Sequence, residues 1–244
     1  AVVTTFRDAL RAHQESVNRL NVYPVPDGDT GTNMALTMES VVAELASAPE
    51  DMAGTCKAIS HGSLMGARGN SGVILSQILR GIASTVAVAE ADGDGADGRV
   101  FAEALAAAAE GAYGAVMRPV EGTILTVVRE ASEAAREAAK GSLLDVLEAA
   151  KERGADALAR TPDLLPVLKE AGVVDAGGCG LLLLLDAALN VVDGRPLPEP
   201  VEVEAPKVVV HSTIDDAHES VSDLRYEVMY FLEAPDETIH AFKD

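Results

Sequence analysis

The sequence contains no tryptophan, and aromatic residues make up only 3% of its 244 residues. A sizeable core is nevertheless expected, because 48% of the residues are hydrophobic and only 24% are charged, as in globular proteins. That core must be built from aliphatic side chains. A chain of this length forms one large domain, or one domain and part of another.

Basic residues are also scarce, with 19 Lys and Arg against 39 Asp and Glu, giving a net charge of −20. This balance excludes nucleic acid as a partner, because phosphate backbones are bound by clustered basic side chains. It also disfavours binding to an anionic membrane surface. The main apolar run, residues 181–185, is far shorter than the roughly 20 residues that span a bilayer. We therefore expect no transmembrane segment, and no signal peptide opens the chain.

Cysteine is rare as well. Cys56 and Cys179 lie far apart and form no CxxC pair, which excludes a zinc site of the usual spacing and a disulfide framework. We expect two reduced cysteines in a cytoplasmic protein.

Helical spacing dominates the sequence from residue 2 to about residue 192, where apolar residues recur on one face and are interrupted by Gly, Pro and capping residues. An all-α domain is predicted. Ser142 is expected to cap the helix that follows it, and Thr161 with Pro162 to open a short helical turn. The spacing predicts about eight helices, the first two carrying Val3 to Leu20 and Met34 to Leu45 and the others near residues 52–65, 71–89, 100–117, 123–140, 143–159 and 180–192.

The amino-acid composition of the sequence changes at three places. Residues 89–98 (AEADGDGADG) are acidic and glycine-rich, which predicts a surface loop, with a metal site as the weaker alternative. Four prolines between residues 196 and 206 indicate an extended linker. Residues 225–233 (RYEVMYFLE) have a strand-like composition, and Asp236 could cap a helix. We therefore expect a helical domain over residues 1–193, a linker over 194–223 and the truncated start of an α/β domain over 224–244.

The densest chemical signal is the segment NVYPVPDGDTGTNM, residues 21–34, between the first two predicted helices. Asp27 and Asp29 stand together at a predicted helix start, and two carboxylates with nearby side-chain oxygens suit Mg²⁺, which shares its ligands with phosphates and water. The helix N-terminus favours anionic phosphates. An ordinary Asp-Gly turn capped by Thr32 or Asn33 is the alternative. The neighbouring oxygens that could complete the metal site belong to Asn21, Thr30, Thr32 and Asn33.

A second glycine-rich segment, MGARGNSG at residues 65–72, precedes an apolar helix. Asn70 and Ser71 are expected to cap that helix, and its backbone N–H groups could approach a phosphate, with Arg68 adding positive charge. The alternative is a close helix contact that the glycines permit. The sequence has no GK dipeptide and no GxGxxG after a strand, which excludes a Walker loop and a dinucleotide fingerprint.

Two further segments join loops to helices. In MRPVEGTILT, residues 117–126, Gly122 and Thr123 open a helix beside Arg118, a candidate partner for phosphate. In VVDAGGCG, residues 173–180, Asp175 precedes two glycines at the head of the last helix. The alternative for both segments is a plain interhelical turn.

Taken together and in this order, the four segments resemble the nucleotide-binding family of dihydroxyacetone kinases, and within it the fatty acid kinase branch, over about residues 1–193. The resemblance implies an antiparallel eight-helix barrel that binds ATP at one end through Mg²⁺, with two ions expected. It places catalysis and metal ligation on Asp27 and Asp29, with Asn21 as a further ligand. Nucleotide contacts are then expected at Thr30, Gly31, Thr32, Asn33, Met34, Asn70, Ser71, Gly72, Arg118, Thr123 and Asp175.

The same resemblance implies an ATP-dependent kinase that phosphorylates a fatty acid carboxylate. The fatty acid is presented by a separate DegV-type carrier protein, and the product is an acyl phosphate. Dihydroxyacetone kinases carry a further carboxylate upstream of their DGD, where this chain has Asn21, and this difference favours the fatty acid branch. A homodimer through the missing domains is left open. Two alternatives remain, a kinase for dihydroxyacetone-like small molecules and a module that senses ATP without transferring phosphate.

Overall fold

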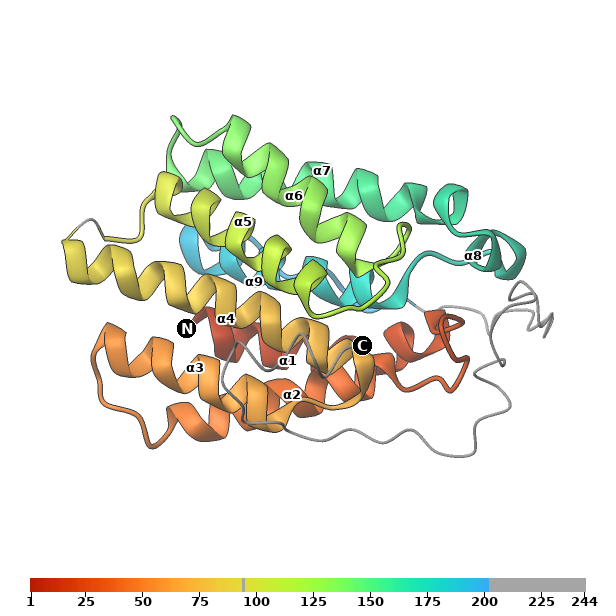
Figure 1. The fold of residues 1–244 in the computed structure, drawn as a ribbon, viewed down its shortest axis with the longest axis horizontal. Helices are drawn as coiled ribbons and strands as arrows, with labels where there is room; N and C mark the ends of the chain where they lie inside the picture. Colours follow the sequence, from red (N-terminus) through yellow and green to blue (C-terminus); the bar gives the residue numbers. More distant parts are fainter. Residues whose placement is uncertain (94, 202–244) are drawn as a thin grey trace. The chain divides into compact units, whose positions relative to one another are not determined.

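The computed structural model describes residues 1–93 and 95–201, and within these ranges it contains helices and no strands (Figure 1). The predicted all-α class is confirmed. The strand-like segment at 225–233 and the helix cap at Asp236 lie outside the described residues. The helices are α1 (Val2–Leu20), α2 (Thr30–Leu45), α3 (Met52–Gly66), α4 (Gly69–Asp92), α5 (Gly98–Gly114), α6 (Ile124–Glu137), α7 (Leu143–Leu164), α8 (Pro166–Ala171) and α9 (Ala176–Asp193).

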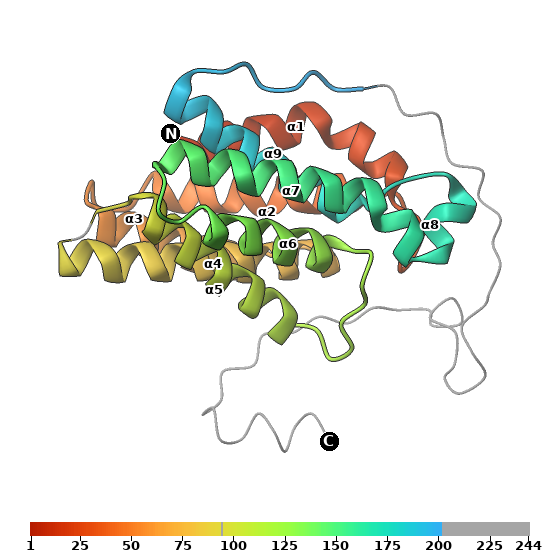
Figure 2. The same cartoon turned by 90° about the horizontal axis from the view of Figure 1, so that it is seen from above.

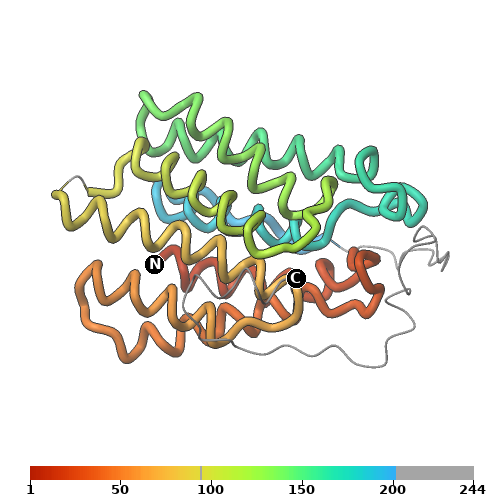
Figure 3. The backbone as a smooth tube through the Cα atoms, in the orientation of Figure 1, coloured from red at the N-terminus to blue at the C-terminus, as the bar shows by residue number. Residues whose placement is uncertain are grey.

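The long helices form a closed antiparallel ring. Each packs against the next one along the chain from α1 to α7, α7 packs against α9, and α9 returns to α1. Short connections between successive helices force them to alternate in direction, and Figure 3 shows the backbone turning back at each end. The eight-helix barrel is therefore present. The short α8, six residues long, is a ninth helix inserted between α7 and α9.

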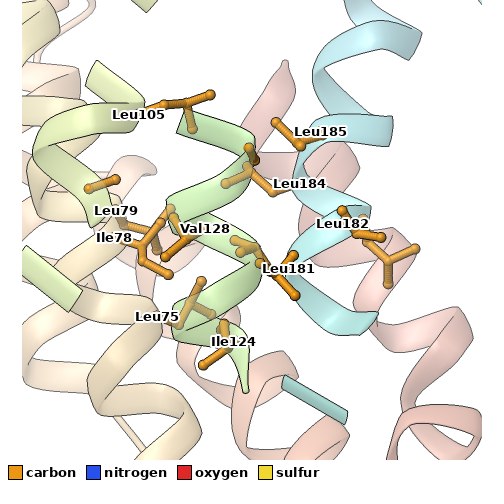
Figure 4. Close-up of a cluster of buried hydrophobic side chains, with 14 of the residues drawn as sticks. Leu75, Ile78, Leu79, Leu105, Ile124, Val128, Leu181, Leu182, Leu184 and Leu185 are labelled. Atoms are coloured by element: carbon orange, nitrogen blue, oxygen red, sulfur yellow. The ribbon is translucent and has the colours of Figure 1, made fainter. Parts of the chain in front are cut away.

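The core of the ring is aliphatic, as the composition predicts. Helix α9 contains five consecutive leucines, residues 181–185, and each of them is buried. Figure 4 shows Leu181 and Leu184 gathered with Leu75 and Ile78 of α4 and Val128 of α6. Glycine and alanine let the helices approach closely, since a Cβ at Gly81 of α4 would lie 2.6 Å from the backbone nitrogen of Ala108 in α5. Small residues at contacts thus compensate for the missing aromatics.

Two of these helices, α4 and α9, have the length and hydropathy of a membrane-spanning helix. In the bundle, 61% of the most apolar stretch of α9 and 33% of that of α4 are buried inside the protein. A core helix of a soluble bundle meets the same criteria of length and hydropathy. The expectation that no segment crosses a membrane stays a prediction.

The predicted helix boundaries are confirmed at some ends and wrong at others. Ser142 caps α7 in a capping box with Asp145, as expected. The expected helix start at Thr161 is wrong, because α7 continues through Pro162 to Leu164. Pro162 has no N–H for the carbonyl of Leu158, and the Thr161 hydroxyl donates to that carbonyl instead, at 2.7 Å. This side-chain hydrogen bond replaces the missing backbone bond and lets α7 tolerate the proline near its end.

Helix α4 is longer than predicted at both ends. It begins at Gly69 with Arg68 as N-cap, so the expectation that Asn70 and Ser71 cap it is wrong, and both lie in its first turn. At the other end it runs to Asp92, and Gly93 ends it with a left-handed φ of +82°. Asp97 then caps α5. The predicted surface loop at 89–98 is correspondingly short.

The residues after α9 do not leave the bundle at once. The side chain of Asn190 donates to the carbonyl of Arg195 at 2.7 Å, Leu197 packs against the core, and His13 of α1 lies 3.0 Å through Nε2 from the carbonyl of Pro198. Figure 2 shows this segment running from the end of α9 along α1, toward the end of α1 that carries Leu20. The first part of the predicted linker is therefore attached to the helical domain.

Candidate nucleotide-binding site

The topology brings all four motif segments to one end of the bundle. Helices α1, α3, α5 and α7 finish at the end where α2, α4, α6 and α9 begin. The connections at residues 21–29, 67–68, 115–123 and 165–175 therefore share that end, on the right in Figure 1. The connections at residues 46–51 and 138–142 lie at the opposite end, as do residues 93 and 95–97.

The loop between α1 and α2 is organised by the buried side chain of Asn21. Its Nδ2 donates to Asp27 Oδ1 at 2.6 Å and to the carbonyl of Val25 at 3.1 Å. Its Oδ1 accepts from the hydroxyl of Thr30, which is also buried, at 2.8 Å. The side-chain amide of Asn21 thus connects Asp27 to Thr30 at the start of α2. These bonds orient Asp27, and the role of Asn21 as a metal ligand stays a prediction.

The two carboxylates stand at the mouth of α2. Asp27 is exposed, and Asp29 is half-buried and is the N-cap residue of the helix. The expected alternative, a cap at Thr32 or Asn33, is absent, because both residues lie inside α2. The described residues hold no cluster of three or more His, Cys, Asp or Glu side chains suited to a metal. Two carboxylates at a helix N-terminus fit Mg²⁺ whose remaining ligands are phosphate and water oxygens.

Close contact with α1 fixes the first turn of α2. The Thr32 hydroxyl accepts from the side chains of Gln14 and Asn18, both at 3.0 Å. A Cβ at Gly31 would lie 2.3 Å from the carbonyl oxygen of Gln14. Met34 is fully buried, with its side chain in the core. The side chains of Thr32 and Met34 are thus engaged within the protein. The N–H of Thr32 is engaged as well, because it donates to Asn18 Oδ1 at 3.0 Å, so a nucleotide could meet only the N–H groups that precede it in this turn.

The second motif packs directly on the first. The N–H of Arg68 donates to Thr37 Oγ1 of α2 at 3.2 Å. Gly69 has a left-handed φ of +58°, and a Cβ there would stand 2.3 Å from Asn33 Nδ2. Gly72 is buried against Thr37 in the same way, while Asn70 is exposed and Ser71 half-buried. The close helix contact that these glycines permit is therefore present between α4 and α2. It also places the first turn of α4 beside α2.

The loop between α5 and α6 is held by a polar network that the sequence analysis missed. Glu121 accepts from the hydroxyls of Thr126 and Tyr113, at 2.6 and 2.8 Å, and pairs with Arg129. Although burial opposes the change, the hydrogen bonds from Thr126, Tyr113 and Arg129 lower the pKa of Glu121. The motif MRPVEGTILT contained Glu121 and Thr126, but Tyr113 and Arg129 lie outside it. Nothing in the spacing linked the four residues.

Within this loop the two predicted contact residues differ. Thr123 is the N-cap of α6, since its hydroxyl accepts from the N–H of Leu125 at 3.3 Å. Arg118 is exposed and forms no ion pair with any residue in the described part of the chain. Thr123 is therefore a structural cap, and Arg118 is a cation at the same end of the bundle.

Asp175 joins three helices from a buried position. Its Oδ2 accepts from the N–H of Gly178 at 2.7 Å, its carboxylate also accepts from the N–H of Ile124, and its own N–H donates to Thr161 Oγ1. The starts of α9 and α6 and the end of α7 therefore meet at this side chain. Burial raises the pKa of Asp175 to about 6, although the two backbone hydrogen bonds oppose the change. This carboxylate positions the helix starts.

The raised pKa of Asp175 predicts a pH-dependent stability. The folded protein binds the carboxyl proton of Asp175 more tightly than the unfolded chain does. The stability that this proton contributes is therefore greatest below about pH 4 and is lost as the pH rises to about 6. The decline should amount to about 3 kcal/mol in the free energy of unfolding. Asp175→Asn, which keeps an acceptor oxygen but cannot ionise, should lack this decline in urea denaturation between pH 4 and 7.

The exposed Asp156 of α7 offers a matched control for that experiment. Asp156→Asn should keep the pH dependence of the parent, because it removes a carboxylate from the protein surface and leaves Asp175 and its hydrogen bonds unchanged. Parallel curves for the parent and Asp175→Asn would show that burial does not perturb this carboxyl group.

A groove of about 480 Å³ lies between α6 and α7, away from the four motifs. It is near the opposite end of α6, and its polar lining includes Glu137, Glu152 and Asp156, with Arg153 paired to Glu137 at 3.8 Å. Three carboxylates would repel a phosphate. This groove is therefore no rival to the motif end as a nucleotide site.

Comparison with known families shows the family to which the chain belongs. The model of the DAK2 domain matches residues 24–190, which is more than half of the sequence and includes Asp27, Asp29 and the three later motifs. The chain belongs to the DAK2 domain family. DAK2 domains are kinase-related nucleotide-binding modules, so the coarse assignment made from the motifs is confirmed.

Similar proteins from staphylococci extend beyond this DAK2 domain. The chain is 43% identical to an uncharacterized protein of Staphylococcus saprophyticus, 45% to one of Staphylococcus epidermidis and 44% to one of Staphylococcus aureus, each over 213 residues. These alignments cover 86% of the chain but 37% of each relative. The chain thus spans little more than a third of the relatives it matches.

Proposed function

We propose that this DAK2 domain binds Mg·ATP at the end where the four motif loops meet, and that it is the phosphoryl-donor part of a fatty acid kinase. The observation that carries the proposal is the placement of Asp27 and Asp29 at the start of α2, beside the start of α4. Phosphoryl transfer requires this kind of site, because it depends on alignment and charge neutralisation more than on covalent help from the protein.

The residues of the chain have separate tasks in this proposal. Asp27 and Asp29 hold Mg²⁺, with two ions expected, and the metal neutralises phosphate charge when bound. Asn21 orients Asp27 through its 2.6 Å hydrogen bond. The N–H groups at the starts of α2 and α4 that are not bonded within the protein face the phosphates. Because the two carboxylates would repel a bare triphosphate, binding of ATP should require the metal.

The acceptor is proposed to be the carboxylate of a fatty acid on a DegV-type carrier protein, giving an acyl phosphate. Asn21 supports this branch, because its amide is engaged with Asp27 and Thr30 where dihydroxyacetone kinases carry a further carboxylate. The segment at residues 195–198 runs along α1 toward the nucleotide end. A cytoplasmic location accompanies the proposal, since ATP is available there.

We expect the 244-residue chain to bind Mg·ATP but to transfer phosphate to fatty acid slowly or not at all. The chain covers 37% of its relatives, and the proposal assigns carrier docking to the remainder. Calorimetry measures the binding, and ADP release with and without a fatty acid-loaded carrier protein measures the transfer. Full-rate acyl phosphate formation by this chain alone would refute the division of tasks.

The same assay separates the alternatives. Turnover of dihydroxyacetone without any carrier would identify a small-molecule kinase. Binding of Mg·ATP with no ADP formed under any acceptor, even when the chain is part of a full-length protein, would identify a nucleotide-sensing module.

A further inference from the structure

Arg68 lies in the connection between α3 and α4, where its main chain is fixed by α2. Its N–H donates to Thr37 Oγ1 at 3.2 Å, and the following Gly69 packs against the side chain of Asn33. The left-handed φ of Gly69, +58°, is one that other residues rarely adopt. The position of Arg68 is therefore set relative to the helix that begins beside Asp29.

The guanidinium group of Arg68 is left without an acidic partner. It is exposed, its one hydrogen bond within the described residues goes to the carbonyl of Ala67 at 3.1 Å, and it forms no ion pair there. Two other arginines, Arg129 and Arg160, are each paired with a glutamate. Arg118, exposed at the same end of the bundle, likewise forms no ion pair within the described residues, and the charge of Arg68 is available to an anion.

The side chain is long enough to reach the metal site. Gly69 touches Asn33, which follows Asp29 by about one helical turn, or about 5.4 Å along α2. An extended arginine side chain spans about 7 Å from Cα to its terminal nitrogens. A phosphate bound through a metal at Asp29 therefore lies within its range.

We infer that Arg68 binds the terminal phosphate of ATP, an inference that rests on the proposed function and extends it. Arg68 is exposed, as a side chain that contacts the transferred phosphate must be. A planar guanidinium donates to two phosphate oxygens at once. As the bond from the terminal phosphorus to the bridging oxygen of ADP breaks and a bond to the acceptor oxygen forms, the electron pair leaves with ADP. Arg68 stabilises the peripheral oxygens throughout and transfers no proton.

The test is calorimetry of Arg68→Gln with Mg·ATP and with Mg·ADP. Loss of charged hydrogen bonds to the terminal phosphate should weaken Mg·ATP binding about 10-fold or more, and leave Mg·ADP binding nearly unchanged. Arg68→Lys keeps the charge but not the planar guanidinium, so its affinity for Mg·ATP should lie between those of the parent and Arg68→Gln. Arg136→Gln is the matched control, since Arg136 is also exposed and unpaired within the described residues but lies at the opposite end of α6. It should bind both nucleotides like the parent.

The outcomes distinguish this inference from the proposed function. If the parent binds no Mg·ATP, the proposed function is wrong. If the parent binds it and Arg68→Gln keeps the parental preference for ATP over ADP, only the role of Arg68 is wrong. An equal loss of affinity for both nucleotides would also contradict it. Thermal denaturation should show an unchanged Tm, because the side chain is exposed.

Discussion

Asp29→Asn should lower the affinity for Mg·ATP by roughly 100-fold or more, because loss of even an outer-shell partner costs 10- to 100-fold and this change alters a proposed direct ligand. The amide keeps the size and hydrogen-bonding ability of the carboxylate but not the charge that holds Mg²⁺ against the phosphates. Asp27→Asn should have a similar effect. Isothermal calorimetry with ATP at saturating Mg²⁺ measures both.

Stability should survive these changes. Asp27 is exposed and Asp29 half-buried, and neutralising one of two neighbouring carboxylates relieves repulsion in the metal-free protein. Asp156→Asn, on the exposed face of α7, removes the same charge far from the loops and should bind Mg·ATP like the parent. If both DGD variants also bound like the parent, the two-carboxylate metal site would be wrong, and the kinase assignment would rest on family membership alone.

Gly31→Ala should destabilise the fold by about 2 kcal/mol, because overpacking a close contact typically costs 1–3 kcal/mol. The added Cβ would lie 2.3 Å from the carbonyl oxygen of Gln14, and relieving this clash requires the main chain of α1 or α2 to shift, which costs free energy. The first turn of α2 would then move away from α1, and Asp29 with it. Urea denaturation should show the lower free energy of unfolding, and calorimetry a weaker affinity for Mg·ATP.

Gly114→Ala is the control for this steric effect. Gly114 is the last residue of α5, and no atom lies within 4 Å of a Cβ added there. Alanine should leave stability unchanged or raise it by up to about 1 kcal/mol, since it is the better helix former. Equal urea midpoints for the parent, Gly31→Ala and Gly114→Ala would mean that α1 and α2 are free to adjust, contrary to the close packing described.

The helical fold was predictable because its signals are local. The 3.6-residue spacing of Phe6, Leu10 and Val17 marks a buried face, and all three are core residues. The failures were at helix ends, where contacts from elsewhere decide. Thr161 resembles a cap next to Pro162, but it is buried, and its hydroxyl bonds the carbonyl of Leu158 and the N–H of Asp175. Such bonds between distant segments leave no trace in sequence spacing.

The candidate site was predictable in its residues but less so in its geometry. The motif around Asp27 and Asp29 stood out, and alternation of helix direction brings the other three motifs to the same end. The orientation of the Asn21 amide and the partners of Glu121 depend on side-chain packing, which residue types alone do not specify. Asp175 was expected as a nucleotide contact, whereas its burial and its bonds to two helix starts were not.

Amide hydrogen exchange with and without Mg·ATP tests the central claim most directly, because it locates the nucleotide on the chain. We predict new protection in the four segments at residues 21–34, 65–72, 117–126 and 173–180. The opposite connections at residues 46–51 and 138–142 should exchange as before. Protection confined to the opposite end, or to the groove between α6 and α7, would contradict a nucleotide site built from the four motif loops.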